Sequence, residues 1–94
     1  MKEIYYTKHL KLRLKFRKIS EDLPREIYLT AKERYFDTAT KKSVAVKRVK
    51  FEGKLKEIAL IYEETSLFVN LITILPLKKY QKFNRIKFKR WQKL

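Results

Sequence analysis

The middle of the chain carries the alternating, β-branched pattern of a sheet. Four stretches between residues 34 and 75 are rich in Val, Ile, Tyr, Phe and Thr, and short breaks separate them: RYFDT, SVAVKRVKF, LKEIALIYE and LFVNLITIL. This pattern predicts an antiparallel meander of three or four strands. We expect Gly53, the only glycine, to supply the positive φ of one turn, and Pro76 to end the sheet.

One of these strands is predicted to lie in the centre of the sheet. Ile58, Leu60 and Tyr62 alternate with Ala59 and Ile61, so both faces of this strand are apolar. Because a strand that is apolar on both faces is usually covered on both, we expect one of its faces to pack against helices.

The segment before the meander combines a strand with helices. Residues 3–6 fit a short first strand, and Thr7 is a suitable helix cap. Residues 9–19 fit two structures: Leu and Phe alternate with cations as in a strand, whereas the abundance of Leu, Lys and Arg favours a helix. The sequence SEDLP at residues 20–24 marks the start of another helix, which extends to about residue 32.

The tail, residues 77–94, has the spacing of a helix over at least its first half. Apolar and aromatic side chains recur there at intervals of three and four, and we expect Leu77 and Tyr80 to be core anchors. The order of elements predicts a single α+β domain over residues 1–94, with its helices on one side of an antiparallel sheet.

Composition removes several classes of protein. The chain has 94 residues and no cysteine, which excludes disulfide scaffolds, thiolate zinc sites and cysteine nucleophiles. The longest apolar run, residues 67–77, is about half as long as a membrane span requires, and no signal-peptide core is visible. We therefore expect a cytoplasmic protein that has no membrane partner.

Charge is concentrated at the two ends of the chain. Of the net charge of +15, residues 1–20 supply +6 (seven basic residues and one acidic), and residues 78–94 supply +8 (eight basic and none acidic). Residues 21–77, with ten basic and nine acidic residues, are almost neutral. If both ends fold onto one face, the resulting field suits RNA, another nucleic acid or an acidic protein.

The single histidine has cations at helical spacing. His9, Arg13 and Arg17 lie at positions i, i+4 and i+8, so a helix would place them on one stripe. An imidazole titrates near neutral pH, and guanidinium groups match phosphate geometry, so the three form a candidate catalytic set for RNA cleavage without a metal. The second proton-transfer group stays open among Tyr62, Tyr80 and Glu63. Two alternatives are open for His9: an ordinary surface histidine of a basic helix, or a structural residue that bonds to the neighbouring strand.

The tail supplies the candidate nucleic-acid contacts, because its cations alternate with aromatic rings that could stack on bases. They are Lys82, Arg85, Lys87, Lys89, Arg90 and Trp91. A basic amphipathic helix on an anionic membrane is a less favoured interpretation. We expect no metal or other cofactor, because Asp22 and Asp37 are the only aspartates and one glycine cannot build a glycine-rich phosphate loop.

The first helix also resembles part of a known family. The segment YTKHLKLRLKFRKIS is similar to the opening of a family of small uncharacterised domains with the pattern Thr-x-His-x3-Arg-x3-Arg-x-Ile-Ser. The matching positions are Thr7, His9, Arg13, Arg17, Ile19 and Ser20. The similarity continues through the hairpin YFDTATKKSVAV and the strand in VNLITILPLKKYQ.

Such domains are thought to be relatives of the RelE/ParE toxins, whose fold is shared by several metal-independent endoribonucleases. The resemblance implies that residues 9–19 are helical. It also implies a RelE/ParE-like fold, in which two N-terminal helices and a C-terminal helix pack on a three- to four-stranded antiparallel sheet. It further implies metal-independent RNA cleavage of toxin type that is neutralised by an acidic antitoxin. The alternative function is a non-catalytic, basic nucleic-acid-binding module on the same fold.

Overall fold

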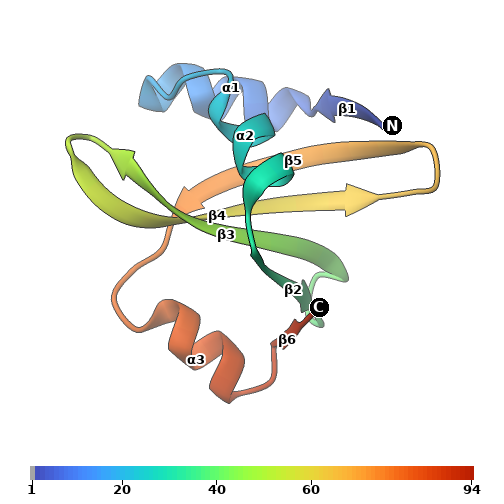
Figure 1. The fold of residues 1–94 in the computed structure, drawn as a ribbon, viewed down its shortest axis with the longest axis vertical. Helices are drawn as coiled ribbons and strands as arrows, with labels where there is room; N and C mark the ends of the chain where they lie inside the picture. The colour runs from blue at the N-terminus through green and yellow to red at the C-terminus, as the bar shows by residue number, and fades with distance from the viewer. Residues whose placement is uncertain (1) are drawn as a thin grey trace.

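The computed structural model describes residues 2–94, which form three helices and one six-stranded mixed sheet (Figure 1). The elements are β1 (Glu3–Tyr6), α1 (Lys8–Arg17), α2 (Leu23–Thr30), β2 (Glu33–Asp37), β3 (Lys42–Phe51), β4 (Lys54–Glu64), β5 (Phe68–Pro76), α3 (Gln81–Lys87) and β6 (Trp91–Lys93). The strand order is β1-β5-β4-β3-β2-β6.

The α+β class is confirmed, but the expected sheet of three or four antiparallel strands is wrong. The meander of β2 to β5 is present as predicted, and two short strands extend it at its edges. β1 pairs with β5 in parallel, and β6 pairs with β2. β6 was missed because its three residues lie in a run of Lys and Arg that has no strand pattern of its own.

Details of the meander follow the sequence pattern. Gly53 lies in the β3–β4 turn with a φ of +79°, and Pro76 is the last residue of β5. β4 lies between β3 and β5 and is buried on both faces over residues 58–60. The predictions for the turn, the end of the sheet and the central strand are therefore confirmed.

The ambiguous stretch is helical. Thr7 caps α1 by accepting a hydrogen bond from the backbone N–H of Leu10 (3.2 Å), and its hydroxyl donates to the carbonyl oxygen of Ile72 in β5 (2.9 Å). Leu10 and Leu14, one turn apart, are the buried side chains of α1. α2 has Pro24 in its first turn and ends at Thr30, two residues before the expected end.

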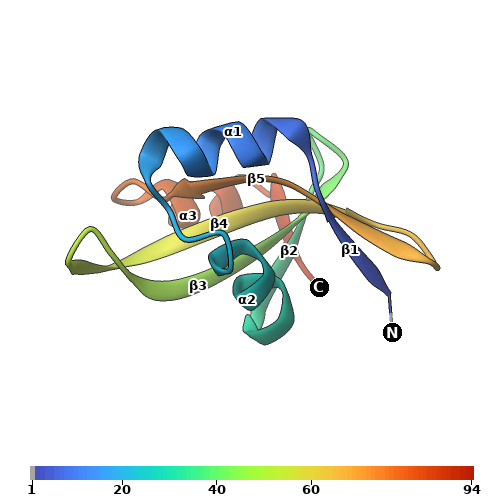
Figure 2. The same cartoon turned by 90° about the horizontal axis from the view of Figure 1, so that it is seen from above.

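The main core lies between the sheet and the two N-terminal helices, which cover the same face (Figure 2). Leu10 and Leu14 of α1 and Ile27 of α2 pack there against Leu60 of β4 and Leu71 of β5. All five are at most 3% exposed, so this layer supplies most of the hydrophobic stabilisation.

The tail covers the opposite face, so the expectation that all helices share one side is wrong (Figure 1). Trp91 of β6 forms a second, smaller cluster with Tyr35, Val44, Val46 and Ala59. The expected anchoring by Tyr80 is also wrong, because Tyr80 is 65% exposed. Leu77 is half-buried and does pack against this cluster, as expected.

The lengths of the helices bear on the expectation that no segment spans a membrane. The longest helix, α1, has only ten residues, and none of the helices within residues 2–94 is long and apolar enough to cross a bilayer.

Candidate nucleic-acid interface

The C-terminal helix α3 is held to the sheet in an unusual way, because none of its side chains is buried. Ion pairs take the place of apolar packing. The ammonium group of Lys82 binds two carboxylates, Glu57 of β4 at 2.6 Å and Glu33 of β2 at 2.9 Å. Tyr35 also donates to Glu33, at 2.7 Å. One lysine thus joins α3 to two strands.

The titration properties of this group follow from its contacts. Burial alone would lower the pKa of Lys82, but hydrogen bonds to Glu57 and Glu33 raise it above its usual value. Burial would raise the pKa of Glu33, yet hydrogen bonds from Tyr35 and Lys82 hold it below its usual value. Burial, with Glu33 as a neighbour, raises the pKa of Tyr35 to about 12. At neutral pH the lysine and Glu33 are therefore charged and the phenol is neutral.

A second anchor fixes the end of the tail. Asp37 is 3% exposed, and its two oxygens share a bifurcated hydrogen bond from the Nε–H of Arg90, at 3.0 and 3.2 Å. It also accepts a hydrogen bond from Nε1 of Trp91, at 3.2 Å. Backbone N–H groups of Ala39 and Thr40 also donate to it. Burial would raise the pKa of Asp37, but the hydrogen bonds, that of Arg90 first, lower it.

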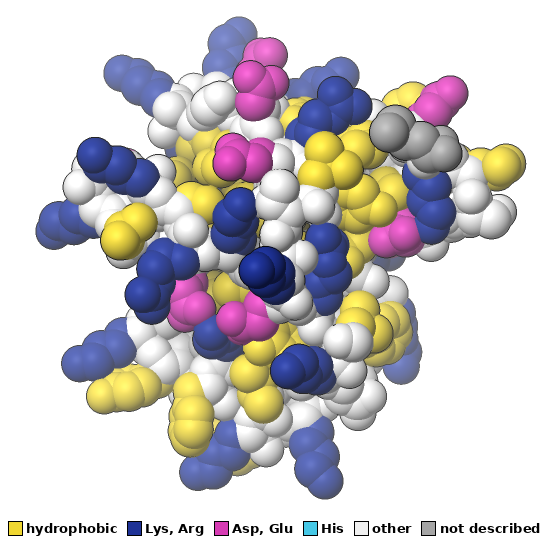
Figure 3. All heavy atoms as spheres, in the orientation of Figure 1, with side chains coloured by type: hydrophobic (Ala, Val, Ile, Leu, Met, Phe, Trp, Pro, Cys, Tyr) yellow, Lys and Arg dark blue, Asp and Glu magenta, His cyan; other side chains and the backbone are white. Residues whose placement is uncertain are grey.

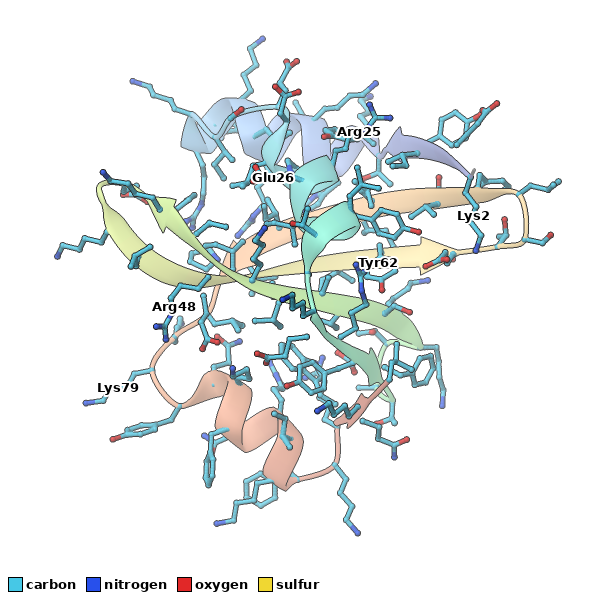
Figure 4. All side chains as sticks on the ribbon, viewed as in Figure 1. Lys2, Arg25, Glu26, Arg48, Tyr62 and Lys79 are labelled. Atoms are coloured by element: carbon cyan, nitrogen blue, oxygen red, sulfur yellow. The ribbon has the colours of Figure 1, made fainter. Side chains whose placement is uncertain are left out.

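The other tail cations have no acidic partner within residues 2–94. Of the eight Lys and Arg residues in the tail, only Lys82 and Arg90 form ion pairs. The remaining six are Lys78, Lys79, Arg85, Lys87, Lys89 and Lys93. The exposed Arg48 of the interior strand β3 and Lys79 lie on the same side of the molecule in the view of Figure 4. Lys93 is close enough to Glu33 to help lower the pKa of that carboxyl. The other five cations of this group present positive charge that no ion pair within residues 2–94 neutralises.

Exposed rings lie among these cations. Tyr80, Phe83 and Phe88 are between 60% and 74% exposed. The ammonium of Lys87 lies 5.8 Å from the centroid of the Phe83 ring and 5.9 Å from that of Phe88. In the space-filling view, apolar side chains alternate with Lys and Arg at the end of the molecule that carries α3 (Figure 3). Rings beside cations are the usual means of holding single-stranded nucleic acid.

The six sequence-predicted contacts thus divide into two groups. Arg85, Lys87 and Lys89 form no ion pair with a described acid, whereas Lys82 and Arg90 are paired with acids of the sheet. The ring of Trp91 stacks on Tyr35 with centroids 5.5 Å apart and is only 5% exposed, so it is not open to a base. Trp91 holds the tail in place instead.

The acids that bind Lys82 and Arg90 are not among the site residues predicted from the sequence. Glu33, Tyr35 and Asp37 alternate along β2, so their side chains share one face of the sheet. This period of two is visible in the sequence. Their partners are not, because Lys82 and Arg90 lie 49 and 53 residues further along the chain.

The predicted catalytic set lies on α1, on the other side of the sheet from the tail. His9, Arg13 and Arg17 line one shallow depression of about 230 Å³, together with the exposed side chains of Leu12 and Phe16. Arg13 is oriented by a hydrogen bond from its Nε to the carbonyl oxygen of Ile74 (2.7 Å). The structure therefore brings the three predicted residues together at an open surface.

None of the three candidates for the second proton-transfer group lines this depression. Tyr62 is buried and accepts a hydrogen bond from Arg34 at 3.2 Å (Figure 4). Glu63 is paired with Lys42, and Tyr80 precedes α3. Within residues 2–94, no three acidic or histidine side chains are grouped closely enough to hold a metal ion.

Comparison of the chain with protein-family models, with curated proteins and with solved structures finds no match. The similarity to relatives of the RelE/ParE toxins therefore stays an expectation from sequence.

Proposed function

We propose that this protein is a nucleic-acid-binding domain whose main contact surface is the C-terminal tail. The observation that carries the proposal is the sorting of the tail cations. Two of the eight hold the tail against the sheet, and the other six have no acidic partner within residues 2–94. Cations that no carboxylate neutralises, placed beside exposed rings, suit a phosphate backbone with unstacked bases.

Charge of this kind predicts a steep dependence of affinity on salt. If about five phosphates are neutralised, the logarithm of the affinity for a single strand falls with a slope near −3.5 against the logarithm of salt concentration. The affinity should then drop about 100-fold between 50 and 200 mM salt. Fluorescence anisotropy with labelled RNA measures this slope.

A pair of double variants tests whether the tail is the contact surface. Arg85→Ala with Lys87→Ala should reduce the slope by about 1 to 2. Lys32→Ala with Lys54→Ala is the matched control, because it removes two exposed cations from outside the tail. Equal losses in both variants, or a salt titration that is flat for the wild type, would contradict the proposal.

A metal-independent endoribonuclease with a RelE/ParE-like fold is the second candidate. The observation that favours it is the shared depression of His9, Arg13 and Arg17 on α1. Guanidinium groups there would hold a phosphate, and the imidazole would transfer a proton. The exposed Leu12 and Phe16 among these cations would suit an acidic, amphipathic segment of an antitoxin.

Cleavage separates the two candidates. Purified protein is incubated with end-labelled RNA, with and without EDTA, and with translating ribosomes. Cleavage that EDTA leaves unchanged supports the ribonuclease. Binding without cleavage under all of these conditions leaves the binding module as the function.

A further inference from the structure

A depression at the junction of α3 and β6 has the composition of a nucleotide site. Its lining residues are Gln81, Asn84, Arg85, Phe88 and Arg90, and its volume is about 280 Å³. Gln81, Asn84 and Phe88 follow one another at spacings of three and four, so they share one face of the helical turn. The volume lies just below the range of about 300–1,000 Å³ typical of small-molecule pockets, which suits a single base.

Arg90 is already positioned at this depression. Asp37 accepts a hydrogen bond from only one nitrogen of Arg90, Nε, and Nη1 and Nη2 have no hydrogen-bond partner among the described residues. A terminal pair of guanidinium nitrogens presents two parallel donors, which is the arrangement that binds phosphate oxygens. Because folding has already restricted this side chain, little further rotamer entropy is lost when it binds an anion.

Phe88 and Asn84 supply contacts for a base. The ring of Phe88 is 74% exposed, so one of its faces is open for stacking. The Oε1 of Gln81 accepts from the backbone N–H of Lys78 at 2.9 Å, whereas the carboxamide of Asn84 makes no hydrogen bond within residues 2–94. A carboxamide with both of its groups available pairs with the donor–acceptor edge of adenine.

We propose that this depression binds one nucleotide of a single strand. The base stacks on Phe88, its edge meets the carboxamide of Asn84, and the flanking phosphates meet Arg85 and Arg90. The inference rests on the proposed nucleic-acid-binding function and adds a preference to it. Since duplex bases are stacked and paired, only a single strand can place a base on Phe88.

The experiment compares a single-stranded RNA with a duplex of equal length, again by anisotropy. Phe88→Ala should weaken single-strand binding roughly 5- to 150-fold, which is the usual loss for one stacked base. It should leave the duplex affinity and the salt slope unchanged, because it removes no charge. Phe88→Tyr keeps a ring and should restore single-strand binding.

Tyr5→Ala is the matched control, since Tyr5 of β1 carries an exposed aromatic ring that lies outside the tail and outside this depression. Asn84→Ala should reduce the preference for oligoadenylate over oligouridylate. If the wild type binds neither the single strand nor the duplex, the proposed function itself is wrong. Normal binding by the wild type with equal single-strand affinities for Phe88→Ala and Tyr5→Ala would overturn the nucleotide site alone.

Discussion

Replacement of Lys82 should loosen α3 without disturbing the rest of the fold. Lys82→Met keeps the apolar stem and removes the ammonium group that joins α3 to Glu33 and Glu57. No side chain of α3 is buried, so little apolar packing replaces the lost ion pairs. The two carboxylates remain about one-third exposed and can hydrate, which limits the loss.

The size of the effect follows from these exposures. Fully exposed ion pairs contribute about 0.2–1 kcal/mol each, and hydrogen bonds to charged groups about 1.5–3 kcal/mol. The side chain of Lys82 is 27% exposed, so its two partly shielded contacts together should contribute about 1–2 kcal/mol. The equilibrium between α3 docked on the sheet and α3 detached from it should then shift roughly 5- to 30-fold toward the detached state.

Amide hydrogen exchange measures this opening residue by residue. Exchange should accelerate by that factor over residues 81–88 and stay unchanged in β4 and β5. Lys87→Met is the matched control, because Lys87 belongs to the same helix and has no acidic partner among the described residues. If the two variants exchange equally fast in α3, the ion pairs of Lys82 do not hold the helix.

Two further predictions concern protons. The folded pKa values of Asp37 and Glu33 lie below their ordinary values of 3.8 and 4.5. The two carboxylates therefore contribute their full stabilisation of the fold when the pH is above these ordinary values, and the contribution is lost as the pH falls through the folded pKa. Fluorescence of the single tryptophan, Trp91, should therefore change below about pH 4, and a change centred above pH 6 would contradict this. If RNA is cleaved, His9→Ala should reduce the cleavage rate about 10²- to 10⁴-fold with little effect on affinity. Arg13→Ala should lower both the rate and the affinity. Unaltered cleavage by His9→Ala would exclude the assigned role of His9.

The meander was predictable because its signals are local. Alternation of apolar residues, a glycine at a turn and a proline at a strand end each act within a few residues. Gly53 and Pro76 occupy the expected places for this reason. The helix at residues 9–19 was harder, because Leu10 and Leu14 fit a helix as well as a strand. Packing against β5 decides for the helix, and the sequence carries no direct record of that contact.

The tail was predicted less well because its structure depends on distant partners. A helical stripe through Tyr80 and Trp91 is visible in the sequence, yet α3 ends at Lys87 and Trp91 belongs to a strand. Pairing with β2 and the hydrogen bond to Asp37 place Trp91 there. Tertiary contacts of this kind override a weak local periodicity.

The acids of the sheet explain why the net charge of the tail predicts only some of the residues that are available to a ligand. The +8 of the tail treats all eight cations alike, but Glu33, Glu57 and Asp37 divide them by position. Lys82 lies between two carboxylates that offset its charge, so it attracts an anionic ligand only weakly. Arg90 is different, because Asp37 binds its Nε and leaves both terminal nitrogens available to a phosphate. A buried acid can therefore fix a cation in the fold and at the same time prepare it for binding.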